Sequence, residues 1–155
     1  MFFDGSDLYK DVVITQLILK ISILLLFGLM CLKSHSLQVI AHQSVKLKSL
    51  SSSQLRRIYS VRQIRWPNNE AIMVFVLPSQ HPVHKTFSKD MLHIFPYQLD
   101  SIWNKLTFSG LGVAPKIVNS QAELIHAVST TRGSIGYVEI LNKENQHVNV
   151  INITK

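Results

Sequence analysis

Residues 71–77 read AIMVFVL, and the loop after them, residues 78–82, reads PSQHP. An uninterrupted apolar run of this length is typical of a strand that is buried on both faces of a sheet. Beyond the loop, apolar residues recur at helical spacing from Val83 to Leu92, and Pro82 is well placed for the first turn of a helix. This stretch therefore predicts a strand, a loop and a helix, with the strand at the centre of a covered sheet.

Strand and helix signals alternate along the rest of the chain. Serine hydroxyls at positions 51–53 can cap one helix, Asn119 can cap another, and the glycines of residues 109–112 can end a third. Strands that alternate with helices indicate an α/β sandwich. The further elements expected are one or two short strands within 37–48, a helix over 55–59, a helix from Pro96 to Leu106, a helix through 124–128, and strands over 135–138 and 147–153.

The composition is that of a folded chain of one domain. It has 155 residues, of which 46% are apolar and 16% are charged, and this excludes a disordered or low-complexity protein. Removal of an N-terminal targeting segment would leave about 120 residues, a usual size for a single domain. The single cysteine, Cys31, lies in that N-terminal part, so the remaining domain has no cysteine for a disulfide or a zinc site.

The N-terminus resembles an export signal. Residues 21–32 read ISILLLFGLMCL, a run of 12 apolar residues, whereas a membrane-spanning helix needs about 20. Small residues flank His35 at the two positions that a signal peptidase reads. We expect residues 1–36 to be a signal peptide cleaved after Ser36, and residues 37–155 to form a periplasmic or secreted domain. An uncleaved anchor is the alternative, because acidic residues precede the run and the apolar segment reaches back to Val12, interrupted by one lysine.

Positive charge gathers in the first half of the expected mature chain. No acidic residue occurs between Asp11 and Glu70. Such a surface attracts oxyanions, polyphosphates, lipid head groups or nucleic acid without choosing among them, and a solvated basic face without a ligand is the alternative. The export signal and the lack of a nucleic-acid-binding motif argue against nucleic acid. The lysines and arginines in the expected mature part of this stretch are Lys46, Lys48, Arg56, Arg57, Arg62 and Arg65.

Several landmarks occur in the order found in a known family. They are SLSSSQLRRIY at 49–59, RWP at 65–67, FVLPS at 75–79, W…LTFSGLGVAP at 103–115 and RGSIGYV at 132–138. Together they resemble the small periplasmic-binding-protein-like domains related to the phosphate-binding protein of ABC phosphate importers. The resemblance covers most of residues 37–138. It implies one lobe of a type II periplasmic-binding-protein-like fold, with a mixed sheet flanked by helices. It further implies binding of phosphate or another oxyanion for ABC-type uptake or sensing, with an ABC permease as partner.

The resemblance places a ligand at the loop after the buried strand. In the two-lobe family this loop carries an Arg and a Gly-Ser-Gly-Thr turn, whereas residues 77–82 here have no Arg and no Gly. Val61 likewise stands where related sequences commonly have a Gly. The alternative for the loop is an ordinary capped helix with solvent-exposed His and Lys side chains. The candidate ligand-binding residues are Ser79, Gln80, His81, His84, Lys85, Arg132 and Ser134.

Other chemistries find little support in the sequence. His81 and His84 are spaced to share a helix face, but no third metal ligand stands near them, and we expect no metal and no other cofactor. The acidic residues are scattered and no catalytic motif is present, so we expect that this protein is not an enzyme. We expect Trp66 and Trp103 to fill the core. A second candidate function is a non-transporting interaction module that docks an envelope or sensor protein through its basic face. Two chains could also pair as a homodimer to rebuild a cleft.

Overall fold

The computed structural model describes residues 15–16, 20, 37–139 and 147–154. From residue 37 onward these residues belong to one compact α/β unit. In the part of the chain that the structure describes, no helix combines the length and the apolar character needed to cross a bilayer. The expected cleavage after Ser36 and the alternative anchor fall outside these ranges, so both stay predictions.

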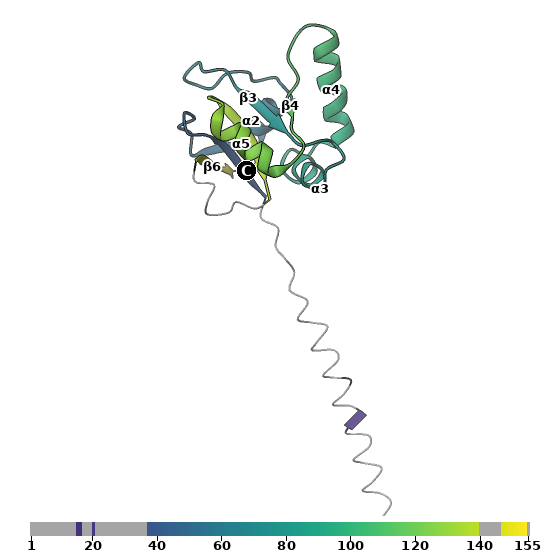
Figure 1. Cartoon of the computed structure of the whole chain (residues 1–155). Coiled ribbons are helices and arrows are strands. Elements are labelled where there is room, and N and C mark those ends of the chain that lie inside the picture. Colours follow the sequence, from purple (N-terminus) through teal and green to yellow (C-terminus); the bar gives the residue numbers. More distant parts are fainter. Residues whose placement is uncertain (1–14, 17–19, 21–36, 140–146, 155) are drawn as a thin grey trace, which may run out of the picture. The chain divides into compact units, whose positions relative to one another are not determined.

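A mixed sheet forms the middle layer of the domain (Figure 1). In the described residues its strand order is β2-β6-β1-β5-β3-β4. Strand β1 is antiparallel to both of its neighbours, whereas β3 is parallel to β4 and β5, and β2 is parallel to β6. The expected mixed sheet flanked by helices is confirmed. The strands are β1 (Gln38–His42), β2 (Ser49–Ser51), β3 (Met73–Val76), β4 (Lys116–Ile117), β5 (Ser134–Val138) and β6 (Val148–Thr154).

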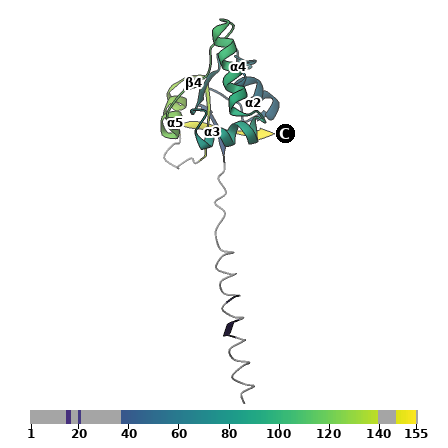
Figure 2. The ribbon, with the colours of Figure 1, turned by 90° about the vertical axis from the view of Figure 1, so that its right-hand side faces the viewer.

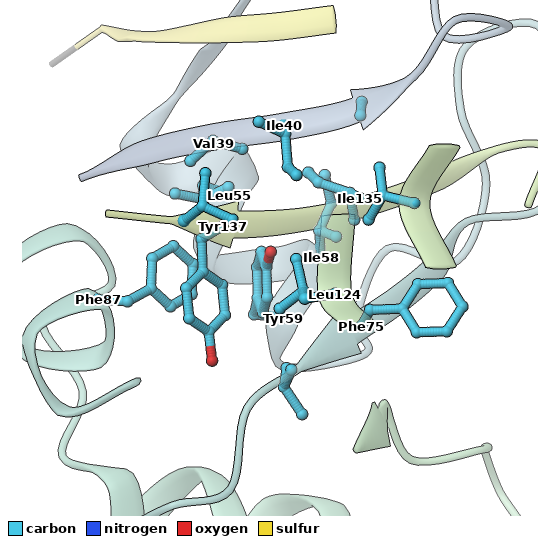
Figure 3. Packing of buried hydrophobic residues seen from close by; sticks show 14 of the residues in the cluster. Val39, Ile40, Leu55, Ile58, Tyr59, Phe75, Phe87, Leu124, Ile135 and Tyr137 are labelled. Carbon is cyan, nitrogen blue, oxygen red and sulfur yellow. The ribbon is translucent and has the colours of Figure 1, made fainter. Parts of the chain in front are cut away.

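Helices cover both faces of this sheet. Figure 2 shows α5 on one face and α2, α3 and α4 on the other. Gly136 in β5 faces α5, because a Cβ added there would lie 2.5 Å from the Leu124 side chain. The next residue, Tyr137, faces the opposite layer and stacks on Phe87 at 3.9 Å between ring centroids (Figure 3). The helices are α2 (Ser52–Tyr59), α3 (Pro82–Thr86), the π-helical turn η1 (Phe87–Met91), α4 (Pro96–Phe108) and α5 (Gln121–Thr130).

Side-chain caps define where two of the helices begin. The Ser51 hydroxyl accepts the Gln54 N–H, and the Gln54 side chain accepts the Ser51 N–H, which is a capping box at the start of α2. The cap of α5 is Ser120 and not Asn119 as predicted. Ser120 has extended backbone and its hydroxyl accepts the Glu123 N–H, while the Glu123 carboxylate accepts the N–H of Asn119. The two residues are neighbours, and the shorter hydroxyl side chain lies within reach of the helix.

The strand over 71–77 differs from its prediction in length and in place. It forms β3 over Met73–Val76 and lies next to the edge strand β4, so the centre of the sheet belongs to β1 and β5. Phe75 and Val76 are buried as expected, but Met73 and Val74 are only half-buried. Strand β4 has two residues and covers only the second half of β3. An apolar run marks burial, and it does not tell which strands lie beside it.

Both tryptophans belong to the core, as predicted. Trp66 and Trp103 are buried, and each indole N–H donates a hydrogen bond of 2.8 Å to a backbone carbonyl, that of Gly133 and that of Tyr59 respectively. Buried tryptophans normally find such a partner for the indole N–H. These bonds tie α4 to the end of α2, and the 65–69 turn to the start of β5.

Val61 has the backbone conformation of a glycine. It lies two residues beyond α2 with φ of 60°, in the left-handed region that a β-branched residue rarely adopts. This explains why a glycine suits the position. Its side chain packs against the core and compensates in part for the strained backbone, which typically costs about 1–2 kcal/mol.

Candidate functional site

The parallel strands direct two loops to one edge of the sheet. Strands β3, β4 and β5 share one direction, so the loops after β3 and β4 both leave at the carboxyl edge. The chain passes from β3 to β4 through α3 and α4, and it returns past β3 to β5 through α5 on the other face. Adjacent loops that diverge to opposite faces form a crevice, and ligands of open α/β sheets bind at such a point. The residues that reach it are Ser79, Asn119 and Ser120.

Ser79 is a candidate ligand-binding residue of the loop after β3, and its hydroxyl has a partner. It donates a 2.6 Å hydrogen bond to the carboxylate of Asp100, which lies on α4, and both side chains are half-buried. A carboxylate accepts hydrogen bonds and donates none when it is ionised. The site therefore combines a hydroxyl with an acceptor-only group, an arrangement that the sequence did not predict.

The other residues of this region agree in part with the alternative prediction, an ordinary capped helix with solvent-exposed His and Lys side chains. His81 is the N-cap of α3, since its Nδ1 atom accepts the Val83 N–H at 3.2 Å. Gln80 and Lys85 are exposed. The loop thus contains a capped helix, as the alternative expected, and the exposed lysine adds a positive charge one turn beyond the cap.

His84 is buried, so the alternative prediction of solvent-exposed His side chains is wrong at this position. It is 0% exposed, and its Nδ1 atom lies 2.5 Å from the Tyr137 hydroxyl. That hydroxyl accepts the Leu77 N–H at 3.0 Å, so its own proton is directed to His84 Nδ1. Burial lowers the pKa of His84 to about 4, with Asp100 partly opposing and His81 adding to the shift. At neutral pH His84 is a neutral core residue that joins α3 to β5.

Two buried polar atoms beside this pair have no hydrogen-bond partner among the described residues. They are Nε2 of His84 and the hydroxyl of Tyr59. The Tyr59 ring lies 6.0 Å from the Tyr137 ring, and the His84 ring lies 6.1 Å from the Trp103 ring. Burial raises the pKa of both tyrosines above the ordinary value, so both stay protonated. The cluster is a neutral polar centre within the helical layer.

The other two candidate residues, Arg132 and Ser134, lie at or just before the start of β5, at the opposite edge of the sheet from Ser79. Ser134 starts β5 and pairs with Met73 at the start of β3, whereas Ser79 follows the end of β3. The Ser134 side chain is buried and donates to the Val128 carbonyl, so it is not free for a ligand. Arg132 is exposed and forms an ion pair with Glu70 at 3.4 Å. The structure therefore does not bring Arg132 and Ser134 together with the Ser79 loop.

Gly133 between them adopts the conformation that the turn requires. Its φ is +69°, and a Cβ at this position would lie 2.3 Å from the Ala71 carbonyl oxygen. No group of three or more potential metal ligands occurs among the residues that the structure describes. The site residues that the sequence did not reveal are Asp100, Asn119 and Ser120. Asp100 reaches Ser79 only because α4 packs back over the loop, which no local spacing reveals.

Comparisons with known proteins bear on the fold. No protein-family model matches this chain, and no curated protein matches it. Solved structures do. One is described as a phosphate ABC transporter substrate-binding protein with bound phosphate from Clostridium perfringens, with a TM-score of 0.61 and 16% identity over 76% of this chain and 44% of that one. Another is PstS from Borrelia burgdorferi, with a TM-score of 0.57 and 18% identity over 77% and 47%.

This chain has the fold of one part of these phosphate-transport proteins. A phosphate-binding protein from Stenotrophomonas maltophilia shows the same likeness, with a TM-score of 0.51 and 15% identity over 78% of this chain and 39% of that one. The resemblance expected from the landmarks is confirmed at the level of the fold. The chain spans less than half the length of each of these proteins. The proteins from Clostridium perfringens and Stenotrophomonas maltophilia are binding proteins by description.

Proposed function

We propose that this domain binds a small oxyanion, phosphate first, at the carboxyl edge of β3 and β4, as an exported solute-binding component of ABC-type uptake or sensing. The observation that carries the proposal is the Ser79 loop. It leaves β3 where neighbouring loops diverge, in a fold whose solved relatives are phosphate-binding proteins. Binding without catalysis is proposed with it, and an ABC permease is the proposed partner.

The Asp100 carboxylate supports phosphate over other oxyanions. At neutral pH part of the phosphate population carries an O–H group, which can donate to a carboxylate, whereas sulfate carries none. With an acceptor-only carboxylate 2.6 Å from the Ser79 hydroxyl, an unprotonated anion would meet an uncompensated negative charge. The Ser79 hydroxyl would turn from Asp100 to the bound oxygen, and the exposed Lys85 would add favourable charge.

Thermal unfolding against added anions tests this proposal. Residues 37–155 are measured with phosphate and with sulfate, at low salt and near ~0.15 M ionic strength, where exposed charges are screened beyond ~8 Å. At a hundredfold excess over its dissociation constant, phosphate should stabilise the native state by about 2.7 kcal/mol at both ionic strengths. Ser79→Ala should abolish the shift, and Ser109→Ala at the far end of α4 should not. An equal response to both anions that disappears in salt would leave only a basic surface.

Asp100→Asn separates selectivity from binding. An amide offers both a donor and an acceptor, so this variant should respond to sulfate as well as to phosphate. A variant that stays selective for phosphate would exclude the carboxylate as the source of the selectivity.

A second candidate function is the non-transporting interaction module. It is favoured by the lack of an Arg and a Gly in the Ser79 loop and by the hydroxyl's bond to Asp100. The docking surface would be the basic face that carries Arg57 and Arg62, both exposed. Capture from envelope extract should return a protein that the double variant Arg57→Glu and Arg62→Glu fails to retain. Capture of nothing by either form would count against this function. Pairing of two chains stays a prediction.

A further inference from the structure

A group of exposed apolar side chains lies where α4 ends. Helix α4 starts beside the Ser79 loop and runs about 20 Å back along its axis, so its last turn lies at the amino edge of the sheet. Both views show this end of α4 and the following segment projecting beyond the strands (Figure 1, Figure 2). Phe108 is 90% exposed, Leu111 81%, Val113 84% and Ile64 61%. We call these four residues the apolar tip.

Three residues of the apolar tip line one hollow. Ile64, Leu111 and Val113 line a cavity of about 350 Å³, whose inner wall is formed by half-buried apolar residues such as Val61 and Val74. Large apolar side chains at this degree of exposure, grouped around one hollow, are unusual on a monomeric soluble protein and mark a contact surface.

The charges around the apolar tip are mostly positive. Lys105 lies one turn before Phe108 on α4, and Arg65 and Lys116 line the hollow. No acidic residue occurs from Ser101 to Ala122, nor among residues 61–69, the two segments that meet here. The nearest carboxylates are already engaged: Glu70 is bound to Arg132, and Asp100, which shares a hollow with Lys105 and Phe108, accepts the Ser79 hydroxyl. The occupant of this surface is therefore both apolar and anionic.

We propose that the apolar tip docks on an anionic lipid surface. Phe108, Leu111 and Val113 enter the boundary between head groups and acyl chains, while Lys105 and Lys116 contact the lipid phosphates. A stable protein partner needs about 800 Å² on each side, and a projecting end offers little flat area. Shallow insertion of a few apolar side chains with flanking cations needs no such area. Ser79 contacts α4 at Asp100, two turns before Phe108, and it is not among the residues that line either hollow at the apolar tip, so a change at Ser79 leaves the tip in place.

Vesicle co-sedimentation tests the proposal. The buried core of the described residues lies entirely between Val39 and Ile151, so residues 37–155 carry a complete core and exclude the apolar N-terminal run from the assay. The probes are vesicles of phosphatidylglycerol mixed with phosphatidylcholine, and vesicles of phosphatidylcholine alone. The domain should sediment with the anionic vesicles and much less with the neutral ones. Equal binding to both, or binding to neither, would overturn the proposal.

Matched variants locate the contact. Phe108→Ser should weaken binding about tenfold or more, and the pair Lys105→Gln with Lys116→Gln should do the same. Val150→Ser removes a 47% exposed apolar side chain from β6 and should leave binding unchanged. Ser79→Ala should also leave it unchanged, which separates this proposal from oxyanion binding. If light scattering instead finds a dimer that Phe108→Ser dissociates, the apolar tip joins two copies and the lipid proposal is wrong.

Discussion

In mild acid this domain should lose stability, and replacement of His84 by asparagine should prevent most of that loss. The imidazole is fully buried, accepts a hydrogen bond from the Tyr137 hydroxyl and has no partner at Nε2 among the described residues. Asparagine places an oxygen near the position of Nδ1, so it can keep the hydrogen bond while it cannot take up a proton. The variant therefore isolates the titration of one side chain.

The expected magnitude follows from the pKa of His84. It is about 4 in the fold against 6.5 ordinarily, so the unfolded chain takes up the proton first as pH falls. The stability that rests on neutral His84 is complete above about pH 6.5 and decreases toward pH 4. The difference corresponds to about 3 kcal/mol over this range. The facing groups that modify it are Asp100, which raises the pKa, and His81, which lowers it.

Urea unfolding at several pH values between 7 and 4 measures this effect, with fluorescence of the buried Trp66 and Trp103 as the signal. The wild type should lose about 3 kcal/mol more than His84→Asn between the two ends of the range. The variant's lower stability at pH 7 does not matter, because the slopes are compared. His126→Asn replaces an exposed histidine and should keep the wild-type slope. Parallel curves for the wild type and His84→Asn would refute the burial of a neutral imidazole as the source of acid sensitivity.

Three further substitutions test the packing. Gly133→Ala should destabilise the domain by more than about 3 kcal/mol in chemical unfolding, because the new Cβ would meet the Ala71 carbonyl oxygen at 2.3 Å in a left-handed backbone; a loss below about 1 kcal/mol would contradict this geometry. Val61→Gly should be more stable than Val61→Ala by about 1 kcal/mol, the reverse of the usual order, and the usual order would show that Val61 is unstrained. Trp103→Phe should cost about 1–3 kcal/mol through the Tyr59 carbonyl left without its donor, and an unchanged midpoint would exclude that bond.

The sequence predicts those elements whose burial leaves a periodic or continuous apolar pattern. Strand β5, helix α4 and the helix capped at Ser51 are examples, and their caps and glycines add independent local signals. Strand β4 has only two residues, both with exposed side chains, so it leaves no pattern to recognise. The order of strands also escaped prediction, because β1 pairs with partners almost the whole domain away along the chain.

The candidate site was predicted less well than the fold. Helical spacing assumes one buried face, but α3 packs against Tyr137 on one side and lies near Trp103 on another, so His84 is buried beside Val83. Asp100 is far from Ser79 in sequence, and only the return of α4 brings them together. A local sequence pattern indicates which face of an element is buried, but it does not indicate which distant element packs against that face.

The pairing of the sheet sets the order in which the chain can fold. Strand β1 is made first, yet its only neighbours in the described sheet are β5 and β6, and β2 pairs with β6 alone. The amino-terminal strands therefore have nothing to bond with until the carboxyl-terminal ones have been synthesised, and contacts of such long range form slowly. The sheet of this domain therefore closes only after β5 and β6 have been synthesised, late in the making of the domain.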